Sequence, residues 1–211
     1  MLTPEKEEGK KVMDKKFGFV LLPTISTEKQ LITLNQKYPT SLIKLDKTVV
    51  LPHCTLLQAS FEYNFNYTPI METIRNYPAF KHPPKTQIGE TTVDGKYVLV
   101  KIINSSWLKL LNKTIIEEVK DFIVKPQLAE LQFHSEAKKR SFLTTGHKYN
   151  LDAYNPHFTV AYNEENNLED IISDLIGTTI QFQRLAYCEH GDYGTIKKVI
   201  EIINLPYHWD S

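Results

Sequence analysis

Cysteine is scarce in this chain of 211 residues, which contains only Cys54 and Cys188. Two cysteines without a Cys-x-x-Cys spacing exclude a disulfide scaffold and a cysteine-bound structural zinc, and they favour a reducing, cytoplasmic location. No stretch approaches the roughly 18 consecutive apolar residues of a membrane span. The charged N-terminal residues also lack the apolar segment of a secretory signal. We therefore expect no membrane partner.

Net charge is lacking as well, because 25 Lys and Arg residues balance 25 Asp and Glu residues. No overall field then draws the protein to bulk DNA, and an anionic ligand has to be held by local groups. The hydrophobic content of 41% is that of an ordinary globular protein. Residues 1–16, rich in Lys and Glu, are expected to form a flexible leader, and residues 17–211 a single, monomeric domain.

Short strands and helices alternate along this domain. Apolar spacing and turn residues predict strands at 17–22, 49–57, 86–93, 96–103, 156–162, 178–188 and 195–204. They predict helices at 27–38, 69–76, 108–122, 127–140 and 166–176. Asp94-Gly95, between two of the strands, is typical of a type I′ hairpin turn. Alternation with tight hairpins indicates an α+β fold rather than a doubly wound parallel sheet.

The predicted order of elements occurs twice. Strand, helix, strand, helix, strand describes residues 17–93 and again residues 96–188, although the two stretches show no obvious sequence identity. We therefore expect two pseudo-symmetric lobes, at about 17–93 and 96–204.

Two tetrapeptides stand out, His53-Cys54-Thr55-Leu56 and His157-Phe158-Thr159-Val160, each preceded by Pro and each inside a predicted strand. Side chains alternate along a strand, so His and Thr share one face while the apolar residues share the other. Each copy lies on the strand after the first helix of its own half. A twofold relation between the halves would bring the two polar faces together.

These motifs and the element order resemble the two-histidine (2H) phosphoesterase superfamily. Its members include RNA 2′,3′-cyclic phosphodiesterases, proteins of the 2′-5′ RNA ligase type and 2′-5′ oligonucleotide phosphodiesterases. The family signature is His-x-Thr/Ser-x once per lobe, with apolar x. The resemblance implies two lobes, each an antiparallel or mixed sheet with helices on its outer side, facing a central cleft. It also implies metal-independent hydrolysis, without a cofactor, of a 2′,3′-cyclic phosphate or a 2′-5′ linked or cyclic oligonucleotide.

Carried over to this chain, the family pattern makes His53 and His157 catalytic and lets Thr55 and Thr159 bind the phosphate of a nucleotide or short oligonucleotide. Imidazole, with a pKa near 6.5, can accept or donate a proton near neutral pH. A threonine hydroxyl on the same face can donate to a non-bridging phosphate oxygen. The sequence leaves open which histidine is the base, and whether the substrate is an RNA end or a nucleotide second messenger.

The same residues allow other interpretations. A non-catalytic module could bind a nucleotide or RNA end with the same groups. A metal hydrolase is disfavoured, because neither strand has a carboxylate on the histidine face. Cys54 as a nucleophile is disfavoured, because it faces the core. The remaining histidines are expected at the surface, in loops or on polar helix faces: His82, His134, His147, His190 and His208.

Four residues near the second motif are further candidates for substrate contact: Lys148, Tyr149, Tyr154 and Tyr162. Aromatic rings stack on bases and an ammonium group pairs with phosphate. Tyr162 occupies the position, five residues after the second motif histidine, where many ligase-type members have Arg. This departure counts against RNA ligation.

Overall fold

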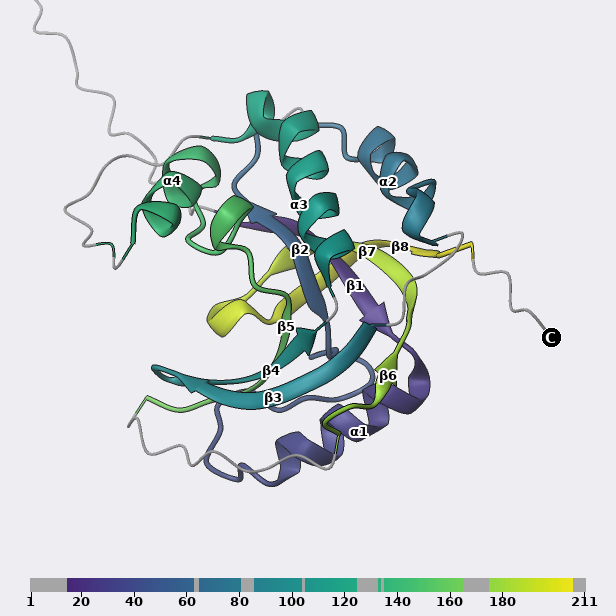
Figure 1. Ribbon diagram of the computed structural model, residues 1–211, viewed down its shortest axis with the longest axis vertical. Helices are drawn as coiled ribbons and strands as arrows, with labels where there is room; N and C mark the ends of the chain where they lie inside the picture. Colours follow the sequence, from purple (N-terminus) through teal and green to yellow (C-terminus); the bar gives the residue numbers. More distant parts are fainter. Residues whose placement is uncertain are drawn as a thin grey trace, which may run out of the picture.

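The computed structural model describes residues 15–62, 65–80, 86–103, 105–124, 133, 135–164 and 175–206. These residues form an α+β fold in which strands of one curled antiparallel sheet are flanked by helices (Figure 1). The strands are β1 (Phe17–Pro23), β2 (Cys54–Ala59), β3 (Thr86–Asp94), β4 (Tyr97–Ile103), β5 (His157–Tyr162), β6 (Thr179–Ile180), β7 (Phe182–His190) and β8 (Ile196–Asn204). The helices are α1 (Ile25–Gln36), α2 (Thr68–Arg75), α3 (Ser106–Val119) and α4 (Glu136–Thr145).

The sheet joins both halves of the chain in the order β6-β3-β4-β5-β2-β1-β7-β8. The expectation of a separate sheet for each half is therefore wrong, since β2 and β5 pair in the middle. The expected boundary between lobes, at residues 93–96, stays a prediction. It falls in the tight turn of the β3–β4 hairpin, whose strands pair with each other, and the C-terminal β7–β8 hairpin pairs with β1.

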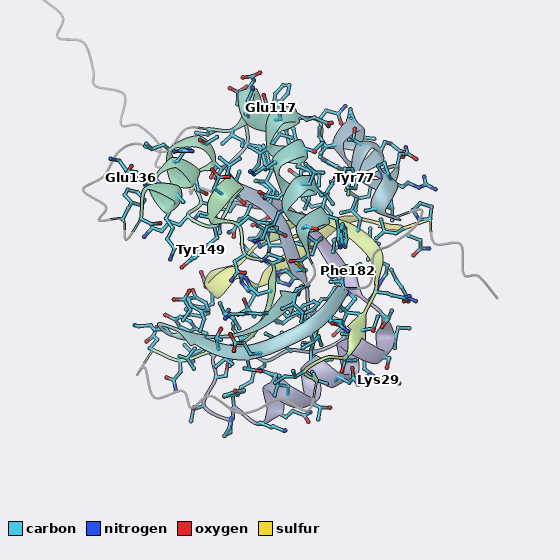
Figure 2. The ribbon with its side chains drawn as sticks, viewed as in Figure 1. Lys29, Tyr77, Glu117, Glu136, Tyr149 and Phe182 are labelled. Carbon is cyan, nitrogen blue, oxygen red and sulfur yellow. The ribbon has the colours of Figure 1, made fainter. Side chains whose placement is uncertain are left out.

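Two helices hold the central strands from opposite ends of the molecule. Helix α1 contacts β1 and β5, whereas α3 contacts β2 and α2. Figure 1 shows α1 near the β3–β4 end and α2 with α3 at the other end. The buried interior between these elements is apolar, and Phe182, labelled in Figure 2, is 1% exposed. None of the helices that the structure describes is both long enough and apolar enough to cross a membrane.

Local hydrogen bonds explain where two elements differ from expectation. Helix α1 begins at Ile25, not at residue 27, because the Thr24 hydroxyl accepts the N–H of Thr27 and caps the helix. Strand β2 begins at Cys54, not at residue 49. The Asp46 carboxylate accepts three successive backbone N–H groups, from residues 48 to 50, and thereby holds this segment in a turn.

The second half differs in the position of α4. This helix covers Glu136–Thr145 rather than 127–140, since Ser135 caps its start and Gly146, with φ of 71°, ends it. Most of the expected helix at 166–176 lies outside the described residues, as do residues 125–132 and the first fourteen residues of the expected leader. Both predicted hairpins are confirmed, and Gly95 has the positive φ, 60°, that the β3–β4 turn requires.

Candidate functional site

The two His-x-Thr motifs lie side by side at the centre of the sheet. Strands β2 and β5 run antiparallel with Cys54 opposite Phe158. Extending this register by one residue sets Thr55 against His157 and His53 against Thr159. Cys54 and Phe158 are both fully buried on one face, whereas the histidines and threonines are half-buried on the other. The alternation expected within each motif thus places four polar side chains on one shared face.

Both imidazole rings are held in the same way. The Nδ1 atom of His53 is 2.8 Å from the carbonyl oxygen of Leu51, and that of His157 is 2.6 Å from the carbonyl oxygen of Asn155. A carbonyl only accepts, so Nδ1 carries the proton in each ring. Each neutral ring therefore keeps Nε2 as an acceptor, and each protonated ring can donate from Nε2.

A cleft of about 440 Å³ opens on this face and is lined by His157, Thr55 and Thr159. His53 is not among the described residues that line it. Its ring centroid is 6.0 Å from that of His190, and it interacts with the backbone of Gly194, a residue of the β7–β8 connection that lines the cleft. The further lining residues include Lys16, Gln58, Asp94, Tyr97, Leu99, His147, Tyr149, Asn150, Tyr154 and Asn155.

The environment favours the neutral form of both motif histidines. Burial lowers the pKa of His53, its hydrogen bonds to the backbone of Leu51 and Gly194 act in the opposite direction, and the charge of His157 lowers it again. Burial also lowers the pKa of His157, while its hydrogen bond to Asn155 and the carboxylate of Asp94 act in the opposite direction. Asp94 is the last residue of β3, at the β3–β4 turn. The carboxylate that acts on His157 therefore comes from outside the strand of the second motif.

His190 does not lie at the surface as expected. It ends strand β7, is 7% exposed, and packs so closely on Gly18 of β1 that a Cβ there would lie 2.6 Å from its Nε2. Burial, with the charges of His53 and His147, lowers its pKa to about 3. No local sequence pattern predicts the burial of His190, because this burial results from the pairing of β1 with β7.

His147 also departs from the expected surface position, since it lines the cleft. Burial lowers its pKa to about 4, with smaller effects from the charges of Lys16 and His157. The other expected surface residues, His82, His134 and His208, lie outside the described residues.

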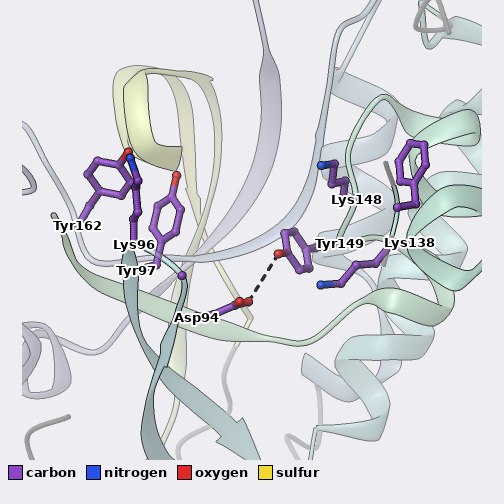
Figure 3. A pocket seen from close by; sticks show the side chains of 9 residues that line it. Asp94, Lys96, Tyr97, Lys138, Lys148, Tyr149 and Tyr162 are labelled. Carbon is purple, nitrogen blue, oxygen red and sulfur yellow. Dashed lines mark hydrogen bonds between the residues drawn. The ribbon is translucent and has the colours of Figure 1, made fainter. Parts of the chain in front are cut away.

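The four further candidates lie in different places. Tyr154 lines the cleft, but its hydroxyl donates to the carbonyl of Thr55 at 2.9 Å and so fixes the strand of the first motif. Tyr149 lines the cleft and also an adjacent pocket, and Figure 2 shows it between α4 and the β3–β4 hairpin. Lys148 and Tyr162 line only the adjacent pocket (Figure 3).

The geometry gives little support to two other chemistries, nucleophilic attack by Cys54 and hydrolysis by a bound metal ion. Burial raises the pKa of the Cys54 thiol to about 12, so the thiolate needed for nucleophilic attack is not formed near neutral pH. Within the part of the chain that the structure describes, no three His, Cys, Asp or Glu side chains are grouped to hold a metal ion.

Comparison with known proteins identifies a shared fold. The chain is similar to the crystal structure of TT0787 of Thermus thermophilus, with a TM-score of 0.51 and 15% sequence identity. The match covers 90% of this chain and 97% of that chain. No family model and no curated protein matches the sequence. At this identity the likeness shows the fold alone.

Proposed function

We propose that this protein is a metal-independent phosphodiesterase of the two-histidine type. Its substrate would be a 2′,3′-cyclic phosphate or a 2′-5′ linked or cyclic oligonucleotide. The observation that carries the proposal is the pair of His-x-Thr motifs on adjacent antiparallel strands, with both rings held through Nδ1. This arrangement presents two imidazoles and two hydroxyls on one face, as transfer at a single phosphorus requires.

Hydrolysis in this site is a balanced exchange of protons. A neutral imidazole accepts a proton from the attacking water at Nε2 as the new O–P bond forms. The protonated imidazole gives its Nε2 proton to the departing oxygen as the other O–P bond breaks. Thr55 and Thr159 donate to the non-bridging oxygens, where negative charge builds up. One water is consumed, and each histidine ends in the protonation state in which the other began.

Asp94 favours one assignment of the two roles. Its carboxylate raises the pKa of His157, whereas no carboxylate of the described residues is among the groups that shift the pKa of His53. The protonated form is therefore better supported at His157. We assign His157 as the general acid and His53 as the general base.

A substrate panel tests the proposal. Purified protein is incubated with 2′,3′-cyclic nucleotides, 2′-5′ oligonucleotides, cyclic oligonucleotides and 3′-5′ controls, and the products are separated by chromatography. We expect hydrolysis that persists in excess EDTA and is abolished by His53→Ala and by His157→Ala. Lys139→Ala, on the exposed face of α4, should retain turnover. Undiminished hydrolysis in both motif variants would refute the catalytic assignment, and loss on chelation that zinc or manganese restores would favour a metal hydrolase.

A non-catalytic nucleotide-binding module is the second candidate. His53 is not part of the described lining of the cleft and lies against His190 and Gly194, which favours this candidate because a general base has to reach the attacking water. The same panel decides between the two. Saturable binding of a nucleotide without product over several hours would favour the module.

A further inference from the structure

A second pocket, of about 300 Å³, adjoins the histidine cleft (Figure 3). Asp94, Tyr97 and Tyr149 line both spaces, so the two are adjacent. The pocket lies between the β3–β4 turn on one side and the region of α4 and its following loop on the other. Its volume is at the lower end of the range of small-molecule sites, about 300–1,000 Å³.

Three lysines surround this pocket, namely Lys96, Lys138 and Lys148. All three side chains are half-buried, and within the described ranges none forms a salt bridge. Arg140, two residues after Lys138, shows the contrast, because it pairs with Asp152. Asp94 is the acidic residue of the lining, so positive charge is in excess and suits an anion.

Aromatic rings supply the other surfaces of the pocket. Tyr149 lies beneath the ammonium group of Lys138, which is 4.7 Å from the ring centroid. Across the pocket, the ring centroids of Tyr97 and Tyr162 are 4.7 Å apart. Tyr162 also stacks on Tyr193 of the β7–β8 connection, with centroids 4.1 Å apart. Rigid tyrosines beside lysines provide a platform for a base and a charge for a phosphate.

We infer that this pocket binds a second nucleotide of the substrate, next to the one whose phosphodiester is cleaved. Its base stacks on the tyrosines, and its phosphate is bound by Lys138 and Lys148. The inference rests on the proposed function and narrows it: the substrate is a short oligonucleotide rather than a mononucleotide. The tyrosine at position 162, where many ligase-type members of the resembled family have arginine, then contributes to a base platform and not to phosphate recognition.

Two ligands that share one reactive group test the inference. Adenosine 2′,3′-cyclic phosphate has a single nucleotide, and diadenylate ending in a 2′,3′-cyclic phosphate adds the second. We expect the double variant Lys138→Ala/Lys148→Ala to raise the KM for the dinucleotide about tenfold. This factor should be at least five times the factor by which the KM for the mononucleotide rises. Lys139→Ala, on the exposed face of the same helix, is the matched control and should change neither KM.

Calorimetric titration of both ligands provides a readout that does not need turnover. The double variant should weaken dinucleotide binding about tenfold. It should also reduce the salt dependence of log Kd by about 0.7, because the two lysines bind one phosphate. Equal effects on both ligands, or no difference from Lys139→Ala, would overturn the inference even if hydrolysis is normal. If the wild-type protein hydrolyses neither ligand and no substrate of the panel, the proposed function fails, and the titration still decides whether the second nucleotide is bound here.

Discussion

Asn35 and Asn112 make matching hydrogen bonds at the two motifs. Each side-chain amide nitrogen donates over 2.6 Å to the carbonyl of the last motif residue, Val160 for Asn35 and Leu56 for Asn112. Each amide oxygen accepts, over 2.9 Å, from a backbone N–H in the segment that precedes a motif. Asn35 belongs to α1 and Asn112 to α3, so each half of the sequence secures the motif strand of the other.

Replacing Asn112 with leucine should destabilise the fold. Leucine has a similar size, but it leaves the Leu56 carbonyl and the Leu151 N–H without partners in the interior, at a cost of about 1–3 kcal/mol for each group. We expect the free energy of unfolding, measured with urea, to fall by about 2–6 kcal/mol. Lys109→Leu on the exposed face of α3 is the control, and an equal effect of the two changes would contradict this role for Asn112.

Removing either motif hydroxyl should slow the reaction without unfolding the protein. Thr55→Val and Thr159→Val keep the β-branched shape that suits a strand but remove the donor to a non-bridging oxygen. We expect kcat to fall by about 10²-fold in each variant, as measured on the best substrate of the panel, while the urea midpoint stays close to that of the wild type. Thr92→Val, on β3, should leave kcat unchanged. A similar kcat for all three variants would exclude the phosphate-binding role.

The local pattern of the sequence predicts the motif geometry well. Strict alternation in His53-Cys54-Thr55-Leu56 predicts which side chains face the core, and the burial of Cys54 and Leu56 agrees with it. The Asp94-Gly95 turn is equally local, because this dipeptide by itself favours the turn in which Gly95 has a positive φ. Features of this kind depend on neighbours along the chain, and a single sequence contains them.

The sequence alone could not predict which distant strands pair with each other. The buried position of His190 depends on the pairing of β7 with β1 over Gly18, and the approach of Asp94 to His157 depends on β4 pairing with β5. The single sheet shared by both halves could not be predicted for the same reason. Nothing near the β7–β8 hairpin shows that it joins β1, which lies at the other end of the sequence.

The pH dependence of kcat/KM should reflect the lowered pKa values of both motif histidines. With His53 neutral and His157 protonated in the active form, the profile is bell-shaped, and its maximum should lie below pH 6.5 because burial lowers both pKa values. Asp94→Asn removes a carboxylate that raises the pKa of His157, so the basic limb should move to lower pH. The measurement is kcat/KM from pH 4 to 8. Movement of the acidic limb instead would reverse the two roles.

Acid should destabilise the protein through His190. Its pKa of about 3 in the folded state lies below the ordinary 6.5, so between these values the unfolded chain binds a proton that the folded chain does not. Stability from this group is therefore present above pH 6.5 and is lost as the pH falls toward 3. At about 1.4 kcal/mol per pH unit, the free energy of unfolding should drop by about 2 kcal/mol from pH 7 to pH 5. Urea titrations at both values measure this drop. His190→Gln, which does not titrate, should be less stable at pH 7 but should lose about 2 kcal/mol less on acidification, and an unchanged pH dependence in this variant would assign the acid sensitivity to other groups.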